Sequence, residues 1–473
     1  MTLTIIGAGP GGYETAVAAA SAGVEVNLIS GGPLGGTCLN EGCIPTKTLC
    51  RDAEILEDVR NAAKFGVMAD GRGFDMKRAQ ERKNEVVSSL RDGIGFLLKN
   101  KLIHLIYGKA VLKDCHTVSV KLAESVDGAG SIDIVSDYII VATGSEPAVL
   151  PVPGVDSGNV LTSGQMLSLD EIPRRLCVIG AGVIGLEFAS IFRSFGSEVT
   201  VLEFCKDILP RFDTDLAKRL KQALGKRGIT IETSARVLSV EDVADGGCSV
   251  KFGKKGSECS VIADKVLMAV GRRPAAGSLN LSGVGIEFTP KGIVTDENMR
   301  TSVPNIFAIG DVRGGMMLAH VAVAEGKRAL NTILAEAASD GTAVPCPLDD
   351  GIALDIVPAA VFTNPEAASV GMTEEDCKAA GIPVKCHKAM FRANGKAVSM
   401  GAPDGFCKLI VAGEGGMHEP GRILGCHIMG AHSADLIHEV AAMMKCRAGL
   451  DELKNMIHAH PTLSEVLMSA ASS

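Results

Sequence analysis

Apolar residues along the chain gather in short runs that end in glycine, and two of these runs share one pattern. The first is LTIIGAGPGG at residues 3–12, followed by the helix-forming run ETAVAAASAG. The second, RRLCVIGAGVIGLEFA at residues 174–189, repeats the apolar run, the glycines and the helix-forming residues. A short apolar run bounded by glycine predicts a buried strand. Both stretches therefore predict a strand, a tight turn and a helix.

Both turns carry glycine at G-x-G-x-x-G spacing: Gly7, Gly9 and Gly12 in the first, and Gly180, Gly182 and Gly185 in the second. Glycine at these places permits a tight turn and lets a pyrophosphate approach the helix N-terminus, where unpaired N–H groups and the helix dipole favour negative charge. One such match is a weak signal. Because the pattern recurs, we expect two dinucleotide sites, one for a nucleotide that is held and one for a nucleotide that is exchanged.

Further apolar runs organise the rest of the chain. SDYIIVATGSEP at 136–147 and DKVLMAVGRRP at 264–274 each predict a strand that runs into a glycine turn, and NIFAIG at 305–310 predicts another strand. Helices are predicted from about 47 to 99 and from about 319 to 336. The predicted regions are 1–147, 148–270, 271–347 and 348–473. We expect an α/β fold with two Rossmann-like dinucleotide-binding domains and a C-terminal α+β domain.

The composition narrows the class of protein. A chain of 473 residues is too long for one hydrophobic core, and its formal net charge of −8 gives no sign of a basic surface for nucleic acid. The apolar runs are shorter than the roughly 18 residues that a membrane helix needs. The first predicted strand begins at residue 3, which leaves no room for a signal peptide. We therefore expect a cytoplasmic enzyme of several domains.

Two cysteines in GGTCLNEGCIPTK, residues 35–47, are the strongest sign of chemistry. Cys38 and Cys43 have four residues between them, at the predicted start of a helix. In an intracellular chain a close cysteine pair is more often catalytic or metal-binding than structural, and a helix N-terminus favours the thiolate that attacks disulfides. The other twelve of the fourteen cysteines are irregularly spaced, and we interpret most of them as small buried residues. We predict a redox-active disulfide between Cys38 and Cys43.

Eight motifs in the chain resemble, in order and spacing, those of the pyridine nucleotide–disulphide oxidoreductases, and in particular their dihydrolipoamide dehydrogenase branch. They are GGTCLNEGCIPTK, GAGVIGLE, VLE, GRRP, IFAIGD, TNPEAASVG, MGAHSADLIHE and HAHPTLSE. The resemblance implies FAD in the first nucleotide site, NAD+ or NADH in the second, and a C-terminal dimerisation domain in a homodimer. It also implies that electrons pass from a dihydrolipoyl group to the disulfide, then to FAD and then to NAD+.

The catalytic positions follow from this resemblance. Cys43 would be the thiolate nearer the flavin, and Cys38 would exchange with the substrate dithiol. His460 would deprotonate that dithiol, because exchange requires a thiolate, and Glu465 would orient His460. Relatives hold the peptide bond before Pro461 in the cis form. We predict no metal site, since the HxH sequence has no third ligand at zinc-like spacing.

The cofactor positions are implied by the same resemblance. Lys47 would lie near the flavin ring and pair with Glu187. The other FAD positions are Gly7, Gly9, Pro10, Gly12, Ser30, Gly36, Thr37, Ala110, Thr143, Gly144, Ser145, Gly310, Asp311, Met317, Leu318, Ala319 and His320. The NAD positions are Gly180, Gly182, Val183, Ile184, Gly185, Glu187, Glu203, Val237 and Gly271.

Residues at the predicted strand ends bear on the choice of nucleotide. Glu203 stands 23 positions after Gly180, close to the spacing at which an acidic residue binds ribose hydroxyls and repels a 2′-phosphate. Phe204 and Cys205 follow in place of arginines, so NAD is favoured over NADP. Ser30 has the equivalent place in the first site, where relatives usually carry Glu. Because Ser30 cannot form charge-assisted hydrogen bonds with the ribose, FAD binding should be weaker by about 1–2 kcal/mol.

Two other functions remain open from the sequence: a related FAD-dependent NAD(P)H:disulfide or metal reductase, and a non-catalytic binding subunit of a multienzyme complex. Glutathione-type reductases usually carry NADP-directed arginines, and mercuric-type reductases a C-terminal cysteine pair; neither occurs here. The presence of Cys38, Cys43 and His460 argues against a binding subunit. The predicted partners are the lipoyl domains of 2-oxoacid dehydrogenase complexes or the H protein of glycine cleavage.

Overall fold

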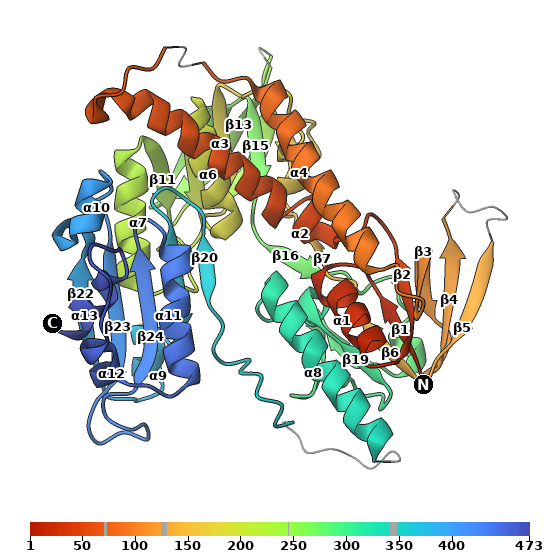
Figure 1. The fold of residues 1–473 in the computed structure, drawn as a ribbon. Coiled ribbons are helices and arrows are strands. Elements are labelled where there is room, and N and C mark those ends of the chain that lie inside the picture. The colour runs from red at the N-terminus through yellow and green to blue at the C-terminus, as the bar shows by residue number, and fades with distance from the viewer. Residues whose placement is uncertain (71–72, 124–129, 245, 340–347) are drawn as a thin grey trace. The chain divides into compact units, whose positions relative to one another are not determined.

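The computed structural model describes residues 1–70, 73–123, 130–244, 246–339 and 348–473 (Figure 1). The chain divides into two compact units, each built from three segments. Unit 1 contains Met1–Thr48, Gln80–Ala148 and Gly271–Leu354, and unit 2 contains Leu49–Ala79, Val149–Val270 and Asp355–Ser473. The division into four regions stays a prediction. The predicted boundary between residues 347 and 348 is at the end of the segment 340–347, which lies outside the described residues.

Unit 1 is built on a seven-stranded sheet with the order β19-β6-β1-β2-β3-β4-β5. Its strands are β1 (Thr2–Ile6), β2 (Glu25–Ser30), β3 (Ile103–Leu112), β4 (Thr117–Leu122), β5 (Ser131–Val135), β6 (Tyr138–Val141) and β19 (Ile306–Ala308). β1 pairs in parallel with β2 on one side and β6 on the other, so the strand order reverses at β1. In open parallel sheets, ligands bind beyond the carboxyl ends of the strands at such a reversal.

Helices cover the apolar faces of this sheet. The helices that lie wholly or partly in unit 1 are α1 (Pro10–Ser21), α2 (Gly36–Asn40), α3 (Cys43–Asn61), α4 (Met76–Leu97) and α8 (Ala319–Ala338). α1 and α8, far apart in the sequence, lie side by side (Figure 1). The buried core under them includes Leu3, Ile5, Leu28, Ile140 and Phe307. Smaller elements are β7 (Ser145–Pro147), β16 (Arg272–Pro274), η2 (Ser282–Val284), β17 (Phe288–Thr289), β18 (Gly292–Ile293) and η3 (Gly310–Arg313).

The first part of unit 2 repeats the parallel arrangement. Its five-stranded sheet has the order β11-β10-β9-β15-β8, and the strands are β8 (Val160–Leu161), β9 (Arg175–Ile179), β10 (Glu198–Glu203), β11 (Ile229–Thr233) and β15 (Lys265–Met268). The helices are α5 (Ser163–Met166), α6 (Val183–Phe195) and α7 (Thr214–Lys226). A three-stranded antiparallel sheet follows, formed by β12 (Arg236–Asp242), β13 (Cys248–Lys254) and β14 (Ser257–Ala263). The start of α3 belongs to unit 1, and its remainder, with η1 (Ala62–Phe65), belongs to unit 2.

The second part of unit 2 is an antiparallel sheet with helices. The strand order is β20-β21-β24-β23-β22, with β20 (Ala359–Val361), β21 (Ala367–Gly371), β22 (Val384–Met390), β23 (Phe406–Ala412) and β24 (Ile423–Met429). Its helices are α9 (Glu374–Ala379), η4 (Phe391–Ala393), α10 (Gly395–Ser399), α11 (Ser433–Lys445), α12 (Leu450–Asn455) and α13 (Glu465–Ala471). Every residue of β23 and β24 is buried.

These elements confirm the predicted fold class: two Rossmann-like sheets and a C-terminal α+β region. A strand, a turn and a helix occur at both glycine motifs, as β1 and α1 and as β9 and α6. The helix predicted from about 319 is α8, and the NIFAIG strand is β19. Within the described ranges, each helix is too short or too polar to cross a bilayer.

Candidate functional site

The glycine turn of unit 1 forms a cradle at the start of α1. Gly9 caps this helix without any side-chain hydrogen bond, and Pro10 follows at its first turn. A Cβ atom on Gly7, whose φ is +116°, would lie 2.2 Å from the Ala142 carbonyl oxygen, and one on Gly12 would lie 1.9 Å from the Gly7 oxygen. Gly36 lies close to this turn, since a Cβ atom added to Gly36 would lie 2.8 Å from the Gly9 Cα. Only glycine fits at positions 7 and 12, and the turn leaves backbone N–H groups at a helix N-terminus for an anion.

The turn of unit 2 has the same construction. Gly182 caps α6, which begins at Val183 and Ile184, without a side-chain hydrogen bond. A Cβ on Gly180, with φ of +105°, would lie 2.4 Å from the Ala269 carbonyl oxygen, and one on Gly185 would lie 2.0 Å from the Gly180 oxygen. The repeated geometry supports one dinucleotide site in each unit.

The two strand ends beside these turns differ. Glu203, at the end of β10, is 7% exposed, and its carboxylate accepts hydrogen bonds from Ala181 N at 2.6 Å and Cys205 N at 2.7 Å. This places a negative charge directly beside the glycine turn. Ser30, at the end of β2, instead donates its hydroxyl to the Gly32 carbonyl at 2.7 Å. Unit 1 therefore lacks a carboxylate at the equivalent strand end.

The two predicted redox cysteines lie together in unit 1. Cys38 is in α2 and Cys43 is the first residue of α3, and the structure carries both as thiols. The hydrogen bond with Cys43, burial and the charge of Cys43 raise the pKa of Cys38, while the Lys47 ammonium opposes this shift. Cys43 lies at the N-terminus of α3, a place that favours the negative charge of a thiolate.

A hydrogen-bonded network joins three parts of unit 1. The Ser145 hydroxyl donates to Asp311 Oδ2 at 2.5 Å, and Arg272 donates from Nε to Ser145 Oγ and from Nη2 to the Ser145 carbonyl, both at 2.7 Å. Burial lowers the pKa of Arg272, whereas the negative charges of Asp311, Glu41 and Cys43 act to raise it. GRRP is one of the motifs that carry the family resemblance, but no role was predicted for Arg272. In the structure β16 at GRRP pairs with β7 at SEP, which brings two distant parts of the sequence together.

Other predicted FAD positions lie on the same unit. Gly310 N donates to Glu325 Oε2 at 2.6 Å, and Glu325 also pairs with Arg313. Met317 and Leu318 directly precede α8, which begins with Ala319 and His320, and Thr37 lies in α2. Thr143 donates to the Ala275 carbonyl at 2.7 Å, next to Gly144 with φ of +75°. Ala110 differs: it is 8% exposed and packs in an apolar cluster with Leu112 and Val120.

The predicted base lies near the end of unit 2. His460 Nδ1 is 2.9 Å from Glu465 Oε1, and Thr462 N donates to Glu465 Oε2 at 2.8 Å. The hydrogen bond from His460 lowers the pKa of Glu465, together with that from Thr462. Because a carboxylate only accepts hydrogen bonds, Nδ1 carries the hydrogen and Nε2 is the basic nitrogen. The His460 side chain is 78% exposed, and the His460–Pro461 bond is cis, as expected.

Some predicted partners belong to different units, so their pairing stays a prediction. Lys47 is in unit 1 and Glu187 in unit 2, where Glu187 is 3% exposed and accepts a hydrogen bond from Phe362 N at 3.0 Å. Cys38 and His460 are divided in the same way. Val237 is buried in β12 of unit 2, and Gly271, with φ of +118°, is the first residue of a segment of unit 1.

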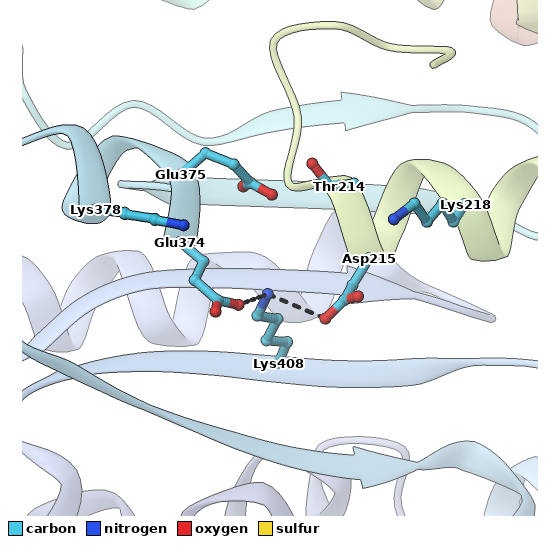
Figure 2. Close-up of a pocket in the computed structure, with 7 residues that line it drawn as sticks. All are labelled: Thr214, Asp215, Lys218, Glu374, Glu375, Lys378 and Lys408. Carbon is cyan, nitrogen blue, oxygen red and sulfur yellow. Dashed lines mark hydrogen bonds and ion pairs between the residues drawn. The ribbon is translucent and has the colours of Figure 1, made fainter. Parts of the chain in front are cut away.

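A polar pocket in unit 2 involves residues that the sequence analysis did not single out (Figure 2). It has a volume of about 270 Å³ and is lined by Thr214, Asp215, Lys218, Glu374, Glu375, Lys378 and Lys408. Lys408, 1% exposed, lies 2.9 Å from Asp213 Oδ2, 3.1 Å from Asp215 Oδ2 and 2.6 Å from Glu374 Oε2. An ammonium donates three hydrogen bonds, so these carboxylates satisfy it. The cluster joins β23 to the starts of α7 and α9.

Comparison with known proteins gives two family matches. The family described as pyridine nucleotide-disulphide oxidoreductase matches residues 1–326, and the dimerisation domain of the same family matches residues 357–471. Among curated relatives, the dihydrolipoyl dehydrogenase of Geobacillus stearothermophilus is 39% identical over 468 residues, covering 99% of this chain and 94% of the relative. That of Bacillus subtilis (strain 168) is 40% identical over 471 residues, covering 99% and 95%.

Two solved structures are similar to the chain over its whole length. The Cu(II) complex of RclA, an HOCl-induced flavoprotein disulfide reductase from Escherichia coli, is 32% identical with a TM-score of 0.84, covering 100% of this chain and 98% of that chain. LpdA from Mycobacterium tuberculosis is 27% identical with a TM-score of 0.87, covering 100% and 99%.

Proposed function

The chain belongs to the pyridine nucleotide–disulphide oxidoreductase family, and within this family we propose that it acts as a dihydrolipoyl dehydrogenase. It would oxidise protein-bound dihydrolipoamide through Cys38 and Cys43, with FAD as cofactor and NAD+ as final acceptor. The observation that carries the proposal is the exposed His460, which is hydrogen-bonded to Glu465 and is a base suited to a thiol substrate. The same chain carries two cysteines that are hydrogen-bonded to each other. Identities of 39% and 40% to two dihydrolipoyl dehydrogenases support it.

The residues of unit 1 fit FAD. The glycine cradle at α1 would hold the pyrophosphate, since Gly7 and Gly12 leave no room for a side chain and the turn opens on a helix N-terminus. Asp311, Ser145 and Arg272 offer hydrogen-bonding groups beside the redox cysteines. When bound, FAD would supply the two-electron chemistry that connects the dithiol to the nicotinamide.

The side chains of the protein would carry out the thiol exchange. His460 Nε2 would remove a proton from one substrate thiol, and Glu465 would stabilise the resulting imidazolium. The substrate thiolate would attack the Cys38 sulfur, forming a mixed disulfide as Cys43 leaves as a thiolate. The second substrate thiol, once deprotonated, would displace Cys38. The substrate is then a disulfide, and the cysteine pair has received its two electrons.

The residues of unit 2 fit NAD. Its glycine turn would hold the second pyrophosphate at the start of α6, and Glu203 would accept hydrogen bonds from the adenosine ribose while repelling a 2′-phosphate. Glu203 already accepts two backbone N–H groups, which fix its orientation, and a carboxylate has further lone pairs for the ribose.

The quaternary structure would be a homodimer. The segment that matches the dimerisation domain contains both His460 and Glu465. In our proposal each His460 serves the disulfide of the partner chain, and the lipoyl group arrives on a partner domain of a multienzyme complex or on the H protein of glycine cleavage.

The test begins with the purified protein. A yellow, FAD-containing protein should reduce NAD+ with dihydrolipoamide as donor, and His460→Gln should slow this reaction by roughly two to four orders of magnitude. FAD content, measured by absorbance, should not change in the variant. Rapid NAD(P)H-dependent reduction of another disulfide, without dihydrolipoamide oxidation, would instead favour a disulfide reductase like the E. coli protein in the structural comparison.

A further inference from the structure

The loop that carries the proposed base contains a second histidine in a different environment. His458 and His460 are two residues apart, but the His458 side chain is 5% exposed and that of His460 is 78% exposed. The predicted mechanism uses only His460. His458 therefore has no role in the proton transfer predicted for this loop.

His458 is held at both ring nitrogens. Nε2 lies 2.9 Å from Glu439 Oε1 on α11, and Nδ1 lies 3.2 Å from the Met456 carbonyl oxygen. The Glu439 side chain is itself 27% exposed, so water only partly competes for this contact. The loop thus carries two histidine–glutamate pairs, one on α11 through Glu439 and one on α13 through Glu465.

Apolar packing contributes little to holding this loop. Leu453 is fully buried before it and Leu463 is 8% exposed after it, but Met456 is 39% and Ile457 is 96% exposed. Polar contacts after His460 include Asn394 Nδ2, which donates to the Thr462 carbonyl at 3.0 Å, and Thr462 N, which donates to Glu465. Within the loop, the Thr462 hydroxyl donates to the Ala459 carbonyl at 2.7 Å. On the N-terminal side of His460, His458 ties the loop to α11 through Glu439.

We propose that His458 and Glu439 form a positioning pair that fixes the loop from α11, so that His460 is presented to the substrate dithiol in one orientation. This inference rests on the proposed dihydrolipoamide oxidation. His458 acts through His460 and does not contact the substrate. A misplacement of about 1 Å in a catalytic group costs up to about a hundredfold in rate, which is the scale of effect to expect.

The two pairs also interact with each other. The pKa of Glu465 is lowered mainly by its hydrogen bond with His460, and the charge of His458 contributes in the same direction. Loss of His458 would therefore change both the position of the loop and the field at the carboxylate that orients the base.

The test compares two reactions of the same holoenzyme. His458→Ala and Glu439→Ala should each lower kcat for NAD+ reduction by dihydrolipoamide roughly 10- to 100-fold. NADH oxidation by ferricyanide, which needs no thiol base, should stay within about twofold of wild type, as should FAD content. Glu439→Gln keeps an acceptor oxygen for His458 and should retain most of the dihydrolipoamide activity. His438→Ala, on the exposed side of α11, is the matched control and should behave as wild type.

A double variant makes the test sharper. If the two residues act as one unit, His458→Ala combined with Glu439→Ala should be no slower than the slower single variant. Equal loss in both reactions, or wild-type dihydrolipoamide activity in the single variants, would overturn the inference. If wild-type protein has no dihydrolipoamide activity, the proposed function fails instead, so the two failures are distinct.

Discussion

The position of one residue, Cys43, explains how a single thiol of the pair can hold the charge. It is the first residue of α3, and the Lys47 ammonium lies one helical turn further along. Cys38, part-buried in the five-residue α2, has a raised pKa because of its hydrogen bond with Cys43 and its burial. The two thiols are therefore not equivalent, and substitution should separate their roles.

A thiolate beside oxidised flavin gives a charge-transfer absorption band at long wavelength. Cys43→Ser should abolish this band on two-electron reduction of the holoenzyme, because no thiolate remains beside the flavin. Cys38→Ser should show this band at rest, because Cys43 is then free as a thiolate next to oxidised flavin. Visible spectra of the purified variants are the measurement. Wild-type dihydrolipoamide activity in either variant would contradict the exchange mechanism.

Glu203 is the residue that should govern the choice of nicotinamide. Glu203→Ala should raise KM for NAD+ roughly ten- to a hundredfold, since hydrogen bonds to a charged group contribute about 1.5–3 kcal/mol, and should relax exclusion of NADP+. Glu203→Gln keeps an acceptor for the glycine turn and removes the charge, so it should mainly affect exclusion of NADP+. Steady-state kinetics with both nucleotides check this.

The control for these variants lies on the neighbouring strand. Glu232 on β11 pairs with Lys254, so Glu232→Ala should change neither KM nor nucleotide preference. An unchanged NAD+/NADP+ ratio in both Glu203 variants would remove this residue from the nucleotide site.

At the scale of elements, the Lys408 cluster joins β23 to α7 and α9. Asp213 is fully buried and depends on Lys408 for its charge compensation. Lys408→Met should lower the free energy of unfolding by about 3–5 kcal/mol, the usual cost of leaving a buried charge without its partner. Lys388→Met removes a 43% exposed ammonium from Asp215 and should cost less than about 1 kcal/mol. Urea unfolding measures both.

The same cluster predicts a pH dependence. Hydrogen bonds from Lys388 and Lys408 lower the pKa of Asp215 to about 2, although burial opposes this. Since the unfolded value is about 3.9, the stabilisation is complete above pH ~5 and is lost as the pH falls through 4 towards about 2. The difference in stability between wild type and Lys408→Met should therefore shrink over that range. A difference in the free energy of unfolding that stays constant with pH would exclude an electrostatic role for Lys408.

Local elements could be predicted from the sequence, whereas long-range pairings could not. The glycine spacing predicts both β-turn-α motifs because the physical requirement is contained within ten residues. The insertion of β19 beside β6, or the contact of Lys408 with Asp213 across 195 positions, leaves no comparable local signal. His460 and Glu465 were identified by a motif, and their hydrogen bond is local. Arg272 was missed because its partner, Ser145, lies 127 residues away.

At the scale of the whole molecule, the proposed active site needs two chains, and this can be tested by mixing variants. A heterodimer of a Cys38→Ser chain and a His460→Gln chain has one intact His460 facing one intact disulfide. It should recover about half of the wild-type activity, since a two-fold dimer has two equal sites. Tandem-tag purification followed by the dihydrolipoamide assay measures this. A verified heterodimer without activity would place both groups of a site in one subunit.

The interleaving of the two units has a consequence for synthesis on the ribosome. The chain passes between units after Thr48, Ala79, Ala148, Val270 and Leu354. When residues 1–270 have emerged, α1 still lacks α8, and β6 still lacks β19, so unit 1 has an uncovered helix face and an open sheet edge. Vectorial folding, in which an N-terminal domain closes before the next is translated, is therefore unavailable to this protein. Unit 1 can close only after residue 338 has been synthesised, so we expect a translational pause before that point to increase the dependence of folding on chaperones.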